Sequence, residues 1–178
     1  MAVDLVLILL IAGGFVVGFF RGAIRQLTSI GALLVSFLLA AYLAGPLGGW
    51  LHDQAPTYSI SYSTFLAFGA SFVLLVTAGA LLFQVAGADM AISRNALLDD
   101  VVGGLLGGVL VVLVLSSLLI ILDNYFVRIG TSPTTEFQFL REAHAATTDS
   151  TVANGLRSTV AALMLGLLGP ILPRELFP

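Results

Sequence analysis

The sequence predicts an all-α polytopic membrane protein with four transmembrane helices and a C-terminal tail that contains amphipathic interfacial helices. Hydrophobic residues make up 58% of the chain and charged residues 10%, whereas a soluble domain contains about 45–50% and about 25% of these classes. The apolar residues are gathered in uncharged runs, each long enough to supply the roughly 20 residues that a transmembrane helix needs. Short polar segments separate the runs. This composition excludes a water-soluble fold, and the pattern of runs predicts membrane-spanning helices.

The first run separates Asp4 from Arg21 by sixteen apolar or small residues. As a helix it measures roughly 26 Å, close to the thickness of the hydrocarbon core. A cleaved signal peptide begins with basic residues, but Asp4 is the only charged residue before this run, so we expect a retained span with its N-terminus outside. Gly14, Gly18 and Gly22 lie four residues apart on one helical face, a spacing that lets a second helix approach closely. That helix belongs either to the same chain or to a second copy.

Two further runs predict the second and third spans. Residues 26–45 form the second, and we expect Gly45-Pro46 to end it. Residues 46–63 contain prolines and aromatic side chains, which are typical of an interfacial loop. The third span is expected to begin near Thr64, after which the chain stays uncharged for more than 20 residues.

The fourth span covers residues 101–122 and directly follows Asp99 and Asp100. It opens with two overlapping GxxxG spacings, one of which joins Gly103 to Gly107. We therefore expect the cytoplasmic end of this span to pack tightly against another helix.

The four spans define a transmembrane domain over residues 1–122, and residues 123–178 are expected to form an extracytoplasmic tail. Within the tail a short helix is predicted after Pro133 and a second one near Ser150. The apolar end of the second helix has only thirteen residues and contains Pro170, which is short for a span. We expect it to lie in the membrane interface, and a fifth crossing is the alternative.

The arginines predict the orientation of the chain. Arg21, Arg25 and Arg94 fall in loops on one side of the membrane, while the N-terminus and the loop over residues 46–63 carry no basic residue. The positive-inside rule then places both the N-terminus and the C-terminus outside.

The composition also excludes several chemistries. The chain has no cysteine, which excludes disulfides, thiolate metal sites and cysteine nucleophiles. All seven basic residues are scattered arginines and the net charge is −3, which disfavours a nucleic-acid partner. His52 with Asp53 falls short of a zinc ligand set, and His144 lacks a nucleophile or paired carboxylate at a recognisable spacing. We therefore predict no catalytic, cofactor-binding or metal-binding residue and no enzymatic activity.

Two motifs resemble those of the CvpA family, bacterial membrane proteins named for colicin V production. The first motif is an aspartate, an apolar span and then Arg-Gly-x-x-Arg, and the second is an aspartate that heads the last span and is followed by glycines at +4 and +8. The matching residues are Asp4, Arg21, Gly22 and Arg25 for the first motif and Asp99, Gly103 and Gly107 for the second. The resemblance extends over residues 1–122.

The resemblance implies a bacterial inner-membrane protein linked to the production or secretion of a toxin, colicin V. The chain departs from the family pattern at Asp99-Asp100, where the family often has Asp-Arg, and at Leu110-Val111, where it often has Arg-Gly. We expect a structural or accessory role in export or envelope integrity. A small transporter or channel is the alternative, which the absence of charged residues within the predicted spans disfavours. The expected partners are the lipid bilayer and either other membrane proteins or further copies of the chain.

A polar cluster is expected where the first and fourth spans meet the cytoplasmic face. Packing between the helix-packing glycines of the two spans would bring the charged residues of both ends together. These glycines are Gly14, Gly18, Gly103 and Gly107, and the cluster consists of Arg21, Gly22, Arg25, Asp99 and Asp100. Partial desolvation strengthens an ion pair over an exposed one, which contributes only about 0–1 kcal/mol. We predict ion pairs within the cluster, and the alternative is that the arginines act only as topology signals.

Overall fold

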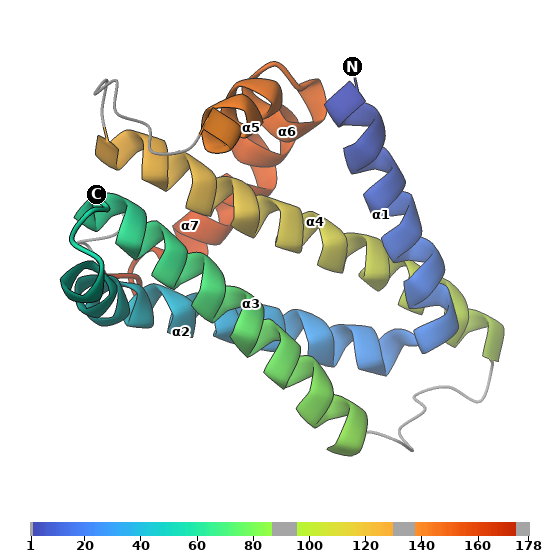
Figure 1. Ribbon diagram of the computed structural model, residues 1–178. Coiled ribbons are helices and arrows are strands. Elements are labelled where there is room, and N and C mark those ends of the chain that lie inside the picture. The colour runs from blue at the N-terminus through green and yellow to red at the C-terminus, as the bar shows by residue number, and fades with distance from the viewer. Residues whose placement is uncertain (1, 87–95, 130–137, 174–178) are drawn as a thin grey trace.

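The computed structural model describes residues 2–86, 96–129 and 138–173, and helices are the only regular secondary structure within these ranges (Figure 1). The predicted all-α membrane fold is confirmed. The elements are α1 (Ala2–Arg21), α2 (Ala23–Gln54), α3 (Ile60–Ala86), α4 (Ala96–Ile129), α5 (Gln138–Thr148), α6 (Thr151–Leu156), the π-helical turn η1 (Arg157–Ala161) and α7 (Ala162–Leu168).

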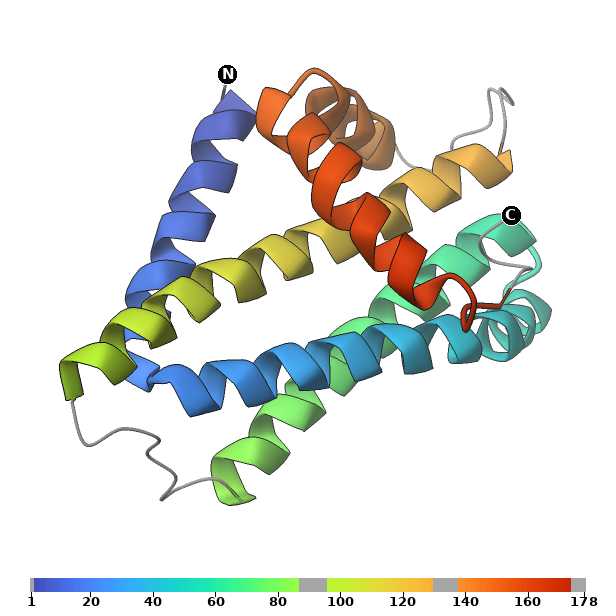
Figure 2. The same cartoon turned by 180° about the vertical axis from the view of Figure 1, so that it is seen from behind.

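The described residues contain five helical stretches that are long and apolar enough to cross a membrane, one more than the sequence predicts. These stretches are Ala2–Arg21, Ala23–Gln54, Ile60–Leu82, Leu97–Val127 and Thr151–Leu168. The fifth arises because α6, η1 and α7 follow one another without a gap and form one continuous helix (Figure 2). The apolar end of this helix alone is too short to span a membrane, whereas the continuous helix over Thr151–Leu168, which includes its more polar first turns, is long enough. The predicted count of four spans is therefore not confirmed.

The second and fourth spans are longer than predicted. We expected Gly45-Pro46 to end the second span, but α2 continues through Pro46 to Gln54, so that prediction is wrong. A proline removes one backbone hydrogen bond and bends a helix, which a membrane helix tolerates when neighbouring helices support it. In the same way α4 extends beyond Leu122 to Ile129 and includes Asp123. As a result, polar residues that the sequence places outside the spans, such as Asp53 and Asp123, lie on helices.

The long helices form two closely packed pairs. The helix α4 belongs to one pair and also contacts both helices of the other pair. The helix α2 packs against α3, and α1 crosses α4 near the end of α1 that leads into α2 (Figure 1). The main core lies between α2, α3 and α4 and is centred on Phe37, whose ring lies 5.5 Å from that of Phe68 and 6.0 Å from that of Phe72. A smaller apolar cluster joins Leu7 of α1 and Leu119 of α4 to the start of the C-terminal helix.

The C-terminal helix shares the main core with the membrane spans. Ala161, Met164 and Leu172 are buried in the same cluster as the side chains of α2, α3 and α4. The Tyr42 hydroxyl of α2 also donates a hydrogen bond to the carbonyl of Ile171. Residues 151–172 are therefore packed against the other membrane helices.

Two neighbouring residues of α7 provide a test of this packing. Met164 is 4% exposed and Leu163 is 65% exposed. We predict that Met164→Trp lowers the free energy of unfolding by about 1–3 kcal/mol, because a larger side chain overfills a packed core. Leu163→Trp adds the same side chain on the outer face of α7 and is expected to change the free energy of unfolding by no more than about 0.5 kcal/mol. Unfolding of the purified protein in mixed micelles measures both, and equal effects would show that α7 does not pack in the core.

Candidate functional site

The helices α1 and α4 touch through their backbones at a row of glycines. A Cβ atom added to Gly18 would lie 2.8 Å from the Cα of Gly107, and one added to Gly107 would lie 2.7 Å from the Cα of Gly18. Similar additions at Gly14 and Gly103 would also meet backbone atoms of the other helix. No larger residue fits at these positions without a shift of a helix. The structure therefore brings all four helix-packing glycines of the sequence analysis together.

Gly22 lies between α1 and α2 and faces a carboxylate of α4. Its φ of +79° is in the left-handed region, which other residues rarely adopt. The carboxylate of Asp99 occupies the space where a side chain would be, since a Cβ atom on Gly22 would lie 2.5 Å from Oδ2. Two independent constraints, one of backbone conformation and one of space, thus require glycine at this position.

Asp99 binds the first turn of α2. The Ala23 backbone N–H donates a hydrogen bond of 3.2 Å to Oδ1 of Asp99. The first N–H groups of a helix have no partner within that helix, and a carboxylate there also interacts favourably with the helix dipole. Asp99 therefore caps α2 although it belongs to α4, a role that its position in the sequence did not indicate.

The structure divides the predicted polar cluster. Gly22 and Asp99 are in contact, whereas Arg21 and Arg25 are both exposed on the outside of the same corner. Within the described part of the chain, Arg21 forms no ion pair with either Asp99 or Asp100. The Asp99 carboxylate is used by a backbone N–H group, and the proposed involvement of Arg25 and Asp100 in the cluster stays a prediction.

A second carboxylate acts in the same way at the other end of α1. Oδ1 of Asp4 accepts hydrogen bonds from the Ser150 hydroxyl at 2.8 Å and from the Val152 backbone N–H at 3.0 Å. The Ser150 hydroxyl oxygen in turn accepts a bond of 3.1 Å from the Ala153 backbone N–H. The first turn of α6 is thus capped by its own serine and by an aspartate of α1. The partners are separated by 146 residues in the sequence, so no local motif indicates this contact.

Asp123 and Arg157 form a two-bond ion pair near this second cap. Nε of Arg157 lies 2.7 Å from Oδ2 of Asp123, and Nη2 lies 2.8 Å from Oδ1. The guanidinium also donates to the Thr147 carbonyl at 2.9 Å and to its hydroxyl at 3.1 Å. His144 is partly exposed and lies 3.5 Å from Asp123, with its ring 4.2 Å from that of Phe126. This group of residues joins α4, α5 and η1.

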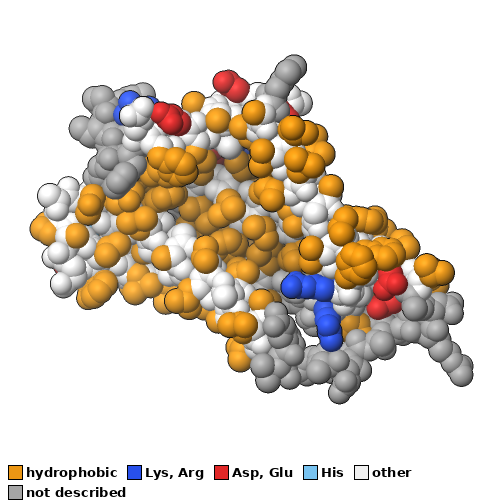
Figure 3. Space-filling view, turned by 45° about the vertical axis from the view of Figure 1, so that its right-hand side comes forward, with side chains coloured by type: hydrophobic (Ala, Val, Ile, Leu, Met, Phe, Trp, Pro, Cys, Tyr) orange, Lys and Arg blue, Asp and Glu red, His pale blue; other side chains and the backbone are white. Residues whose placement is uncertain are grey.

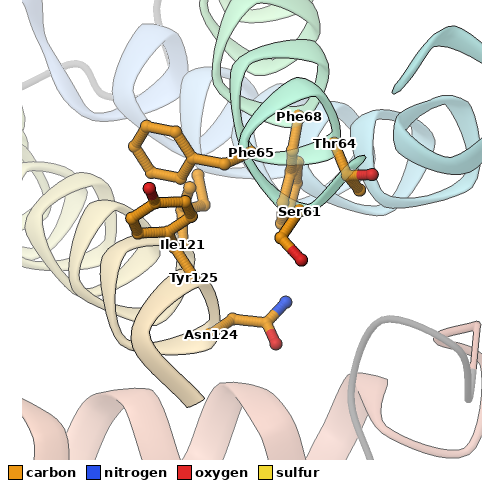
Figure 4. Close-up of a pocket in the computed structure, with 7 residues that line it drawn as sticks. All are labelled: Ser61, Thr64, Phe65, Phe68, Ile121, Asn124 and Tyr125. Atoms are coloured by element: carbon orange, nitrogen blue, oxygen red, sulfur yellow. The ribbon is translucent and has the colours of Figure 1, made fainter. Parts of the chain in front are cut away.

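A small pocket lies between α3 and α4. Figure 4 shows the Ser61 hydroxyl and the Asn124 amide pointing toward one another, with the rings of Phe65 and Tyr125 to one side. The cavity volume is about 10 Å³, roughly the minimum that one water molecule needs. It is too small for an organic substrate. Among the described residues no group of three or more His, Cys, Asp or Glu side chains is placed to hold a metal ion.

Residues 3–161 match the family model described as Colicin V production protein. This range covers most of the chain and includes α5, α6 and η1 as well as the four predicted spans. No curated protein matches the chain. No solved structure matches it.

Two glycines of α1 provide a matched test of the contact with α4. We predict that Gly18→Ala lowers the free energy of unfolding by about 1–3 kcal/mol or more, because the added methyl group meets the backbone of α4. At Gly13 a Cβ atom would meet nothing within 4 Å, so Gly13→Ala is expected to be neutral or to stabilise by up to about 1 kcal/mol through helix propensity. The measurement is unfolding in mixed micelles. A tolerated Gly18→Ala would contradict the backbone contact.

Proposed function

Because the chain belongs to the Colicin V production protein family, we propose that it is an accessory membrane protein that supports export or envelope integrity through a structural role. It does not act as an enzyme in this proposal. Its place is the bacterial inner membrane, and its partners are other membrane proteins or further copies of the chain. The observation that carries the proposal is the use of carboxylates to hold helices together.

Three aspartates on the membrane helices have partners on other helices. Asp99 of α4 caps α2, and Asp4 of α1 caps α6. Asp123 of α4 binds Arg157 of η1. Charged residues within membrane helices usually mark an ion or substrate path, but here each of these carboxylates serves to fix one helix against another. This supports a rigid scaffold.

The outer face of α1 offers a surface for a membrane partner. Its apolar side chains point away from the rest of the molecule, and only 11% of this span is buried. The helix is held at both ends, at Asp4 and at Gly22, so that its outer face is presented in a fixed orientation. Such a face suits contact with lipid and with an apolar helix of another membrane protein.

The alternative function, a small transporter or channel, is favoured by a different observation. Oε1 of Gln26 and Oγ of Ser116 are buried, and neither has a hydrogen-bond partner within the described residues. A buried polar atom without a partner is costly and commonly binds water. Water bound at these two positions, one on α2 and one on α4, would support a polar path between the helices.

A photocrosslinking experiment distinguishes the two functions. A photoreactive amino acid at Leu9, which is 61% exposed on α1, is expected to capture a defined membrane protein or a second copy of the chain in intact cells. The same label at the buried Phe37 is the control and should capture none. The accessory role would be contradicted if Leu9 captured only lipid while the purified protein alone conducted ions or solutes in liposomes.

We also propose that the N-terminus and the C-terminus both lie outside the cytoplasm. The absence of native cysteine allows single cysteines to report orientation. We predict labelling from outside at Ser59 and Thr148 and protection at Ala23 and Ala96. A cysteine at Pro178 tests the C-terminus separately, since a fifth crossing would move it to the cytoplasm. External labelling at Ala23 would overturn the orientation.

A further inference from the structure

The corner between α1 and α2 carries two exposed arginines on the surface of the membrane domain. Arg21 ends α1, and Arg25 lies in the first turn of α2. Figure 3 shows arginine side chains (blue) side by side, next to apolar surface (orange) and close to acidic side chains (red). The acid that lies against this corner, Asp99, directs Oδ1 to the Ala23 backbone N–H. The charge of Arg21 is therefore not neutralised by an ion pair with any of the described residues.

Exposed apolar side chains flank this pair of cations. Phe20 immediately precedes Arg21 and is 82% exposed, and Leu27 of α2 is 59% exposed. The rings of Phe19 and Phe20 meet edge to face at 5.9 Å. The apolar surface continues along α1 through Val16 and Val17. The corner thus places two exposed arginines beside a long apolar strip.

We propose that Arg21 and Arg25 bind the phosphate of an anionic phospholipid, with its acyl chains lying along Phe20 and the adjoining apolar side chains of α1. A guanidinium binds phosphate through two parallel hydrogen bonds. The two arginines end an uncharged span, which places them at the depth of the lipid headgroups. Such a lipid offers a phosphate of charge opposite to that of the arginines and acyl chains for the apolar side chains beside them.

The attraction is local to this corner. The whole chain has a net charge of −3, so the protein as a whole repels anionic lipid. A basic residue near an anionic membrane surface strengthens binding by about fivefold. Selective retention of anionic lipid must therefore come from particular arginines.

Native mass spectrometry tests the lipid site. The wild-type protein is released from nanodiscs of equal parts phosphatidylglycerol and phosphatidylcholine, and the ratio of retained lipids is measured. We expect a preference for phosphatidylglycerol that falls about fivefold in Arg21→Gln. In the double variant that combines Arg21→Gln with Arg25→Gln it should fall about 25-fold. The variant that combines Arg21→Lys with Arg25→Lys keeps both charges but loses the paired hydrogen bonds of the guanidinium groups, and should retain only part of the preference. The control is Arg141→Gln, which changes an exposed arginine of α5. This substitution should leave the preference for phosphatidylglycerol unchanged.

Photolabelling of the wild-type protein keeps the test decisive if the Gln variants do not fold. Phosphatidylglycerol with a photoreactive group near its phosphate should label residues 16–27, and inorganic phosphate should not displace it. The proposal fails if the label appears elsewhere, if free phosphate displaces the lipid, or if folded Gln variants keep the wild-type preference. A loss in Arg141→Gln equal to that of the double variant would also overturn it.

Discussion

The backbones of α1 and α4 touch through glycines, and the positions of the polar residues at both ends of α1 depend on this contact. Lipid is as apolar as the side chains that face it, so helices in a membrane associate through close packing and hydrogen bonds. The contact of Gly18 with Gly107 provides such packing. It also brings Asp99 against Gly22, where the carboxylate caps α2. The direction of α1 is then fixed at one end, and Asp4 fixes it at the other.

Both caps solve the same physical problem. The first turn of a helix has backbone N–H groups without partners, and near the membrane these groups cannot rely on water. In the protein a carboxylate of a different helix accepts a hydrogen bond from one of these N–H groups. Asp99 does so for α2 and Asp4 does so for α6. Each acid therefore satisfies a backbone donor and joins two helices at once. A single substitution at either position would disturb both a helix end and the packing of a second helix, which is why these residues suit a scaffold.

The sequence was informative where local spacing determines structure and uninformative where distant residues meet. Gly14, Gly18, Gly103 and Gly107 could be recognised because the small-xxx-small spacing places them on one face. The ion pair of Asp123 with Arg157 joins residues 34 positions apart, and no motif marks it. The predicted end of α2 at Pro46 was wrong because proline bends a supported membrane helix without ending it. The length of the C-terminal helix was underestimated because Arg157 interrupts its apolar pattern. The contact of this arginine with the Asp123 carboxylate is evident only in the three-dimensional structure.

The distance between the Ala23 amide and the Asp99 carboxylate in a lipid bilayer shows directly whether the glycine contact positions α1, α2 and α4. Solid-state NMR of protein labelled with ¹⁵N-alanine and with ¹³C at the aspartate carboxyl group measures the dipolar coupling between them. We expect a measurable coupling between these two labels, since the Ala23 nitrogen lies 3.2 Å from Oδ1 of Asp99. Absence of a measurable coupling in the folded protein would contradict the glycine contact as the constraint that positions α1, α2 and α4.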